Sequence, residues 1–404
     1  MDITPFTISG IPRILFGEGR FAELPELVAS FGRRALVVTG SRSFRASSHW
    51  ADLTESLRDL GVSWDVVTVE GEPSAELVDE SVAAYHERQI DVVLGIGGGS
   101  SIDAAKAIAG LLPFGNSVMD HLEVVGRGIP YTGPPTPCIV VPTTAGSGAE
   151  ATKNAVLSTR GPEGYKRSFR HDSLVPKVAL VDPVLTYGCS PDLTATSGMD
   201  AVTQLLESYV STGASPFTDA LALSGLAAAQ GGLFQVYEGI PAGRGAMSYA
   251  ALLSGITLSH AGLGVVHGLA SPLGAYFPIP HGVACAALLA PATRMNIKAL
   301  CERAPDSPAL GKYAVLASLL SNERTETDAS ACSLKPKPAA TEEKSPETLV
   351  STLSLWTDSL RIPRLSAYGV TEADLPKIAA GCSAKTNPVA LTEEELVGIL
   401  RESL

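Results

Sequence analysis

The first half of the chain alternates short apolar runs with stretches in which apolar residues recur at helical spacing. Runs such as Arg34–Gly40 (RALVVTG) and Pro137–Thr144 (PCIVVPTT) are apolar almost throughout, as in strands that are buried on both faces. Because strands alternate with helices, the pattern predicts an open, mostly parallel α/β sheet. The predicted strands are 6–8, 13–16, 34–40, 64–69, 92–96, 137–144 and 175–182, and the predicted helices include 21–31, 43–60 and 74–88.

The hydrophobic pattern changes after Pro183, where strand-like runs nearly vanish and helical spacing takes over. This change predicts two domains, an α/β domain over residues 1–186 and an all-helical domain over residues 187–404. Residues 321–347 are polar and poor in large apolar side chains, which indicates a surface excursion. The predicted helices of the second domain are 193–211, 215–237, 245–258, 283–296, 309–321, 346–360 and 392–404.

The stretch Asp91–Ala107 (DVVLGIGGGSSIDAAKA) reads as a buried strand, a glycine loop and a helix. The loop Gly97–Gly99 lets backbone N–H groups approach a phosphate, and the start of the helix adds partial positive charge. Ser100 and Ser101 are expected as N-caps. A tight turn needs one glycine, so three glycines and two serines favour a phosphate site, although the spacing is not that of the GxGxxG fingerprint.

Small and polar residues end three of the predicted strands, at Thr39–Gly40, Gly97–Ser100 and Thr143–Thr144. Ligands of open α/β sheets bind at the carboxyl ends of the strands. The three loops therefore predict one nucleotide site at a common edge of the sheet.

Composition narrows the class of protein. The 404 residues are 45% hydrophobic and 18% charged, so a large core is expected, and the net charge of −12 argues against nucleic acid as a partner. We find no signal peptide and no stretch of about 20 apolar residues, so a cytoplasmic protein without a membrane span is expected. The six cysteines show no CxxC pairing and are expected as reduced thiols.

The helical half carries a second chemical signal. Asp200 and Gln204 are four residues apart and share one helix face. His267 and His281 are each followed by glycine, which favours tight helix ends, and we give the neighbouring His260 no role. Two histidines and an aspartate suggest a first-row metal site, although each histidine alone is more simply a buried polar residue.

Several segments of the chain match a known family pattern together. They are PRILFGEG (12–19), GGGSSIDAAK (97–106), PTTAGSGAE (142–150), LVDP (180–183), SGMDAVTQLLESYVS (197–211), GLGVVHGLASPLGAYFPIPHGVACA (262–286) and the closing NPVALTEEELVGILRESL. With these segments the chain resembles the iron-containing (group III) alcohol dehydrogenase family, which is related to glycerol dehydrogenase and dehydroquinate synthase. The resemblance covers nearly the whole chain and implies a dehydroquinate synthase-like fold with the active site between the two domains. We also expect a homodimer.

Matched residue by residue, the resemblance implies NAD or NADP and a divalent metal, which is iron in the family. The implied metal ligands are Asp200, His267 and His281, with Gln204 as a possible fourth, and the implied catalytic residues are His267 and Ser271. Lys106 is expected to support the loop and its helix. The expected cofactor-binding residues are Thr39, Gly40, Ser41, Arg42, Gly97, Gly98, Gly99, Ser100, Asp103, Thr143, Thr144, Ser147, Lys153 and Leu185.

Two positions depart from the family pattern. Gln204 stands where the family has a histidine ligand, and Ser271 stands where it has a histidine near the substrate. Glutamine is a weaker donor than imidazole, so zinc, a weakly bound metal and no metal all stay open beside iron. With Ser271, proton release is expected to run through the cofactor ribose and water.

The resemblance implies reversible hydride transfer between an alcohol carbon and the nicotinamide, assisted by the metal. The run Ala270–Pro280 lacks fixed charges, so a small or medium neutral alcohol, or its aldehyde or ketone, is expected as substrate. Two alternatives are a metal-independent reductase similar to maleylacetate reductase and, less favoured, a lyase similar to dehydroquinate synthase.

The loop after the strand Arg34–Gly40 bears on the choice of cofactor. A carboxylate at such a position binds the ribose 2′-OH of NAD, and residues 37–49 contain none. Ser41 and Arg42 can instead donate to a 2′-phosphate. The loop therefore predicts that NADP(H) is accepted and preferred. The simpler alternative is a turn whose arginine is solvated and binds no cofactor.

Overall fold

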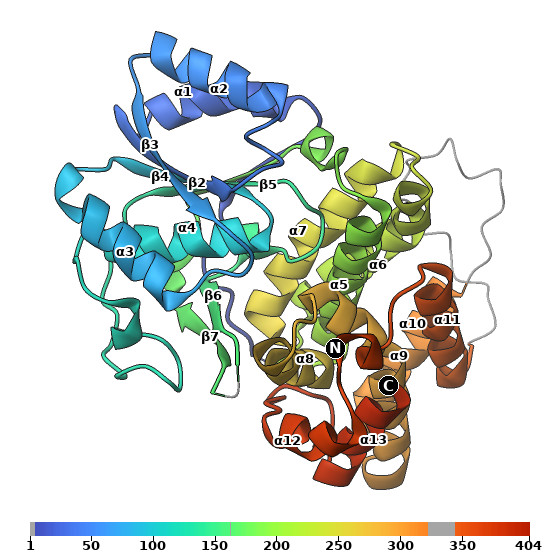
Figure 1. The fold of residues 1–404 in the computed structure, drawn as a ribbon. Helices are drawn as coiled ribbons and strands as arrows, with labels where there is room; N and C mark the ends of the chain where they lie inside the picture. Colours follow the sequence, from blue (N-terminus) through green and yellow to red (C-terminus); the bar gives the residue numbers. More distant parts are fainter. Residues whose placement is uncertain (1–4, 162, 322–343) are drawn as a thin grey trace.

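The computed structural model describes residues 5–161, 163–321 and 344–404. These residues form an α/β part, followed along the chain by a helical part (Figure 1). Most of the predicted polar excursion, residues 322–343, lies outside the described residues.

A six-stranded sheet lies at the centre of the α/β part, in the order β1-β8-β5-β4-β2-β3. Every strand pair in this sheet is parallel, which confirms the predicted sheet type. The central strands are apolar throughout because both of their faces are buried; every residue of β4 is buried. The strands are β1 (Arg13–Phe16), β2 (Arg34–Gly40), β3 (Ser63–Val69), β4 (Val92–Gly97), β5 (Cys138–Pro142) and β8 (Val178–Val181).

Helices cover both faces of the sheet and divide its core in two. On one face, Leu53 and Leu57 of a covering helix pack in the cluster that contains Val37. On the other face, Ile102 packs in the cluster that contains Val38. The helices of the first face are α1 (Leu24–Ala29) and α2 (Ser48–Asp59), and those of the second are α3 (Ala75–Tyr85) and α4 (Gly99–Leu111), as Figure 1 shows.

Two features of the α/β part differ from the sequence prediction. The predicted strand 6–8 is wrong: Phe6 is 48% exposed, and β1 forms this edge of the sheet without a further neighbour. An antiparallel hairpin of β6 (Asn154–Thr159) and β7 (Tyr165–Arg170) was not predicted. Its strands are partly buried, so they lack the continuous apolar runs of the central sheet.

The second part is helical throughout its described residues, as predicted, and its helices share one hydrophobic core. The long α5 begins after Ser190, whose side chain accepts a hydrogen bond from the N–H of Leu193. The helices are α5 (Pro191–Val210), α6 (Pro216–Tyr237), α7 (Gly243–Ala261), α8 (Val265–Tyr276), α9 (His281–Arg303), α10 (Pro308–Leu320), α11 (Pro346–Ser359), α12 (Leu375–Ala380) and α13 (Glu393–Glu402).

Helices α8 and α12 were not predicted. Helix α8 contains Gly268, Gly274 and Pro272, which read in the sequence as helix breakers. At Gly268 the small residue serves packing, because a Cβ there would lie 2.8 Å from Cys382 Sγ. Tertiary contacts thus maintain a helix that local propensity opposes.

The two parts of the chain are in direct contact. A Cβ on Gly148, after β5, would lie 2.4 Å from the backbone nitrogen of Gly255 in α7, so both positions require glycine. The hairpin also contacts α8, where Gly161 donates its N–H to the carbonyl of Ala275 at 3.2 Å. These contacts place the loop after β5 against α7 and the hairpin against α8, the helix that carries His267.

No single described helix is long and apolar enough to cross a membrane; only α7 and α8 taken together, with a bend of 102° between them, meet the criteria of length and composition.

Candidate metal and nucleotide site

The ends of β2, β4 and β5 lie side by side, because β4 pairs with both of the other strands in parallel. The loops that follow them are in contact. The N–H of Thr143 donates to the carbonyl of Gly97 at 2.9 Å, and a Cβ on Gly40 would lie 4.0 Å from Ser101 Oγ. The structure therefore brings together the three loops from which the sequence analysis predicts a nucleotide site.

The loop after β5 packs tightly on the glycine loop. A Cβ on Gly98 would lie 3.4 Å from Thr144 Oγ1, and one on Gly99 would lie 2.7 Å from Ser147 Oγ. At Gly99 only hydrogen at the α-carbon allows the two loops to approach this closely, whereas a Cβ at Gly98 would make an ordinary contact. Gly99 is thus required by the neighbouring loop, whether or not a phosphate is bound.

The expectation that Ser100 and Ser101 cap α4 is wrong. The N-cap is Gly98, no side chain caps the helix, and both serines lie in its first turn. The first N–H groups of an α-helix have no partner within the helix. Because no side chain caps them here, these groups are the ones that could bind an anion.

Lys106 and Asp103 fasten α4 to the chain after β5. Lys106 Nζ is buried, lies 2.9 Å from Asp103 Oδ1, and donates to the carbonyl of Ala149 at 2.9 Å and to Thr152 Oγ1 at 2.7 Å. Burial raises the pKa of Asp103, although Lys106 opposes this shift. Lys106 thus supports the helix, as expected. Asp103 forms an ion pair with this lysine.

The other predicted cofactor residues are spread over the same domain. Thr39 is fully buried at the end of β2, and its Oγ1 has no hydrogen-bond partner among the described residues. Ser41 and the exposed Arg42 follow in the loop. Lys153 forms an ion pair with Asp172 at 2.8 Å on the surface. Leu185 packs against one of the two sheet cores.

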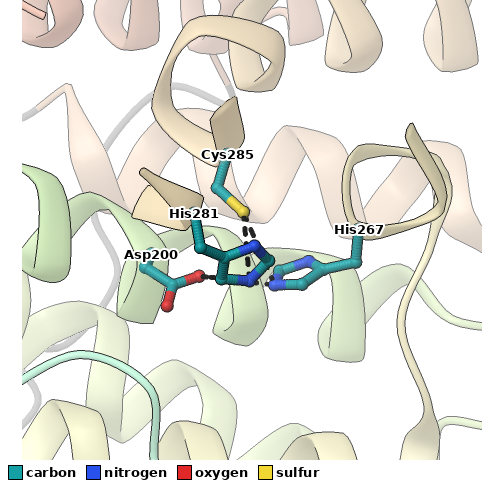
Figure 2. Close-up of side chains that lie close together, drawn as sticks. All are labelled: Asp200, His267, His281 and Cys285. Atoms are coloured by element: carbon teal, nitrogen blue, oxygen red, sulfur yellow. Dashed lines mark hydrogen bonds and ion pairs between the residues drawn. The ribbon is translucent and has the colours of Figure 1, made fainter. Parts of the chain in front are cut away.

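Four side chains from three helices converge in the helical part, as Figure 2 shows. Asp200 comes from α5, His267 from α8, and His281 and Cys285 from α9. Their candidate donor atoms all lie within 4.8 Å of one another. Asp200 Oδ1 lies 3.4 Å from His267 Nε2 and 3.8 Å from His281 Nε2. Two donors bound at about 2.1 Å in a tetrahedron are about 3.4 Å apart, so these spacings fit one metal ion.

Glu207, one helical turn beyond Gln204 on α5, orients His267. Its Oε2 accepts a hydrogen bond from His267 Nδ1 at 2.6 Å, and its Oε1 accepts one from the N–H of Val266 at 2.7 Å. This hydrogen bond keeps a proton on Nδ1, so Nε2, which faces Asp200, is the nitrogen that would bind a metal. Although burial opposes the shift, Cys285, Asp200 and Glu207 raise the pKa of His267 well above 6.5, so a metal would displace the proton from Nε2. Metal-binding histidines usually donate the N–H of their second ring nitrogen to a carboxylate, a backbone carbonyl or water in this way.

Burial and neighbouring charges set the protonation of the cluster. Burial, followed by the charge of Lys166, lowers the pKa of His281 to about 4, so this imidazole is neutral and able to bind a metal. Burial opposes ionisation of Asp200, but His281 and His267 outweigh it and lower the pKa of this carboxyl. Asp200 Oδ1 is nevertheless buried without a hydrogen-bond partner among the described residues. An anionic oxygen that faces two imidazole nitrogens at 3.4 and 3.8 Å, without a hydrogen bond to either, suits a bound cation.

Gln204 and Ser271 are both engaged elsewhere. Ser254 Oγ, on α7, donates to Gln204 Oε1 at 2.6 Å, so the oxygen proposed as a ligand already accepts a hydrogen bond. Ser271 lies one turn after His267 on α8, and its Oγ donates to the carbonyl of His267 at 3.2 Å. His260 is bonded to the carbonyl of Ile256 on its own helix and lies outside the cluster.

The interpretation of the two His-Gly pairs as helix ends is wrong, since both histidines lie at the beginnings of helices. The sequence analysis also missed Glu207 and treated Cys285 as an ordinary thiol. Spacing contained a signal for both, because Glu207 is seven residues after Asp200 and Cys285 is four after His281, each on one helix face.

Comparison with known proteins shows which family has this arrangement. Residues 12–183 match the family described as iron-containing alcohol dehydrogenase, and residues 194–404 match the C-terminal domain of the Fe-containing alcohol dehydrogenase family. The chain belongs to the iron-containing alcohol dehydrogenase family.

Relatives in this family match over nearly the full length of the chain. The chain is 30% identical to alcohol dehydrogenase 4 of Saccharomyces cerevisiae, covering 100% of this chain and 99% of the relative. It is also 30% identical to an NADPH-dependent butanol dehydrogenase of Clostridium saccharobutylicum, over 96% and 95% of the two chains. The crystal structure of a 1,3-propanediol oxidoreductase has a TM-score of 0.85 at 28% identity and covers 99% of this chain and 100% of its own.

Membership of this iron-containing alcohol dehydrogenase family confirms the fold and the reaction class that the sequence analysis predicts. The chain is an NAD(P)-dependent oxidoreductase that acts on small alcohols and aldehydes, and the family implies a divalent metal.

Proposed function

We propose that this enzyme transfers hydride between NADP(H) and a small or medium neutral alcohol, and that Asp200, His267 and His281 hold its metal. The convergence of these three side chains from separate helices is the observation that carries the proposal. When bound, the metal supplies a Lewis acid for the oxygen of the alcohol or carbonyl. Glu207 keeps the lone pair of His267 directed to the cluster.

The nucleotide would lie on the α/β part. The uncapped first turn of α4 offers backbone N–H groups for the pyrophosphate, and Thr143, Thr144 and Ser147 line the adjacent loop. The division at residue 186, the homodimeric state and the cytoplasmic location stay predictions.

The surroundings of the cluster favour a neutral substrate. Lys166, on β7, approaches α8: a Cβ on Gly274 would lie 3.9 Å from its Nζ. This lysine is ion-paired with Glu72 at 2.6 Å, so the pair carries no net charge. A lyase acting on a sugar phosphate would need a cluster of unpaired basic groups here, and the pairing of Lys166 counts against that alternative.

Support for NADP(H) comes from the end of β2, where exposed Arg42 follows Gly40 and Ser41. The butanol dehydrogenase relative is NADPH-dependent, which agrees with this choice. The test compares kcat/KM for NADPH and NADH on one aldehyde. Wild-type enzyme should prefer NADPH, and Arg42→Ala should lower only the NADPH value.

A Gly40→Asp variant tests the same position from the opposite side. The nearest atom to a Cβ there is Ser101 Oγ at 4.0 Å, so the backbone has room for a Cβ. The new carboxylate should shift preference toward NADH by about 1–3 kcal/mol, the scale of a hydrogen bond to a charged group. Gly40→Asn is the uncharged control. A wild-type preference for NADH that Arg42→Ala leaves unchanged would show that this loop does not bind the 2′ position.

A further inference from the structure

Cys285 is the one member of the four-residue cluster to which neither the sequence analysis nor the family pattern gives a role. It is fully buried on α9, one turn after His281, and its side chain points toward the other three (Figure 2). Its Sγ lies 3.7 Å from His267 Nε2 and 3.7 Å from His281 Nε2.

These spacings match a thiolate bound to the same metal as the imidazoles. Zn–S bonds of about 2.3 Å and Zn–N bonds of about 2.05 Å in a tetrahedron place sulfur and nitrogen about 3.6 Å apart. Both observed S–N distances are 3.7 Å, and the oxygen of Asp200 lies 3.4 and 3.8 Å from the two nitrogens. The side chains therefore need little movement to enclose one ion.

Gln204 is engaged by a neighbouring helix, since its Oε1 accepts a hydrogen bond from Ser254 on α7. Among the His, Cys, Asp and Glu side chains of the described residues, the buried sulfur of Cys285 is the fourth donor within reach of the two histidines and Asp200.

We propose that Cys285 is the fourth protein ligand of the metal, and that its sulfur makes the site select zinc over iron. The inference rests on the metal-dependent function proposed above. Thiolate is a soft ligand that favours zinc, and zinc also accepts the imidazole and carboxylate donors of this cluster. On binding, the sulfur–metal bond replaces the S–H bond, and the proton passes to solvent.

Cobalt spectroscopy of metal-stripped enzyme tests the ligand directly. Co²⁺ added to wild-type protein should produce a thiolate-to-cobalt charge-transfer band in the near ultraviolet. Cys285→Ser should lose this band, with folding checked by circular dichroism. Gln204→Ala should retain it, and so should Cys382→Ser, a matched control whose thiol packs near Gly268 outside the cluster.

Metal competition tests the selectivity. Because most sites bind Zn²⁺ more tightly than Fe²⁺, the informative quantity is the ratio of the two affinities, measured without oxygen in wild type and in Cys285→Ser. The ratio should be clearly larger in wild type, and an equal ratio would overturn the selectivity. Removing the hydrogen-bond partner of a metal ligand lowers metal affinity by about 10–100-fold. Removing a ligand itself, as in Cys285→Ser, should therefore weaken zinc binding by about a hundredfold or more.

The outcomes separate this inference from the proposed function. Cobalt that binds wild-type enzyme without a charge-transfer band would overturn the role of Cys285 and leave a metal-dependent dehydrogenase. Absence of cobalt and zinc binding in the wild type would overturn both. Because the wild-type spectrum decides the question, a Cys285→Ser protein that does not fold leaves the test intact.

Discussion

Glu207→Gln removes the carboxylate that orients His267 while keeping nearly the same shape. The carboxylate accepts two hydrogen bonds, at 2.6 Å from His267 Nδ1 and at 2.7 Å from the N–H of Val266. An amide has one oxygen, so it can accept only one of the two. If the NH₂ group faces His267, the imidazole must carry its proton on Nε2, which removes the lone pair directed toward Asp200. If the NH₂ group faces Val266 instead, it lies against the backbone N–H of that residue. Two buried donors then lack an acceptor, at a cost of about 1–3 kcal/mol.

Either orientation should weaken metal binding by about 10–100-fold, the usual effect of losing the partner of a metal-binding histidine. A chelator competition assay with zinc measures this change, and excess metal should restore alcohol oxidation. Glu302→Gln, which removes an exposed carboxylate at the end of α9, controls for the altered charge. If Glu207→Gln bound zinc as tightly as wild type and only melted at a lower temperature, the carboxylate would have a purely structural role.

Two further predictions concern the α/β part. Burial raises the pKa of Glu150 from 4.5 to about 7. Between these two pH values the carboxyl is protonated in the folded protein and ionised in the unfolded chain. The free energy of unfolding should therefore fall by about 3 kcal/mol as pH rises through this window. Glu150→Gln should therefore melt higher than wild type at pH 8 and equally at pH 4; equal melting at both values would contradict the raised pKa. Gly99→Ala places a methyl group 2.7 Å from Ser147 Oγ, a contact that costs about 1–3 kcal/mol unless the loops move apart, and it should therefore weaken cofactor binding, measured by fluorescence titration. Gly245→Ala, where nothing lies within 4 Å of a new Cβ, should bind cofactor as wild type does, and equal binding by Gly99→Ala would refute the tight contact between the loops.

The sheet was predictable because its central strands are apolar on both faces. Runs such as Val92–Gly97 leave few alternatives to a buried strand, and the order of strands and helices implies parallel pairing. The strand predicted at 6–8 has a similar local pattern, but a strand needs a neighbour, and no local pattern reports whether one is present. The hairpin β6–β7 was missed for the opposite reason, since its strands are only partly buried.

The metal cluster was predictable only in part. Asp200, His267 and His281 suggested a metal site in the sequence, but only the family resemblance implied that they bind one ion, because their spacing in the chain says little about their distance in space. Helix α8 was hidden by Gly268 and Pro272, whose roles depend on tertiary packing. The contact between Glu207 and His267 joins helices 60 residues apart in sequence, which no helical periodicity could reveal.

Metal removal and restoration is the most direct test of the central claim, that Asp200, His267 and His281 hold a metal on which alcohol oxidation depends. Enzyme stripped of metal by a chelator should lose activity with NADP⁺ on a panel of small alcohols and regain it when a divalent ion is returned. His267→Ala should stay inactive and bind little metal under the same treatment. Full activity in the metal-free enzyme would contradict the account and would favour a metal-independent reductase similar to maleylacetate reductase.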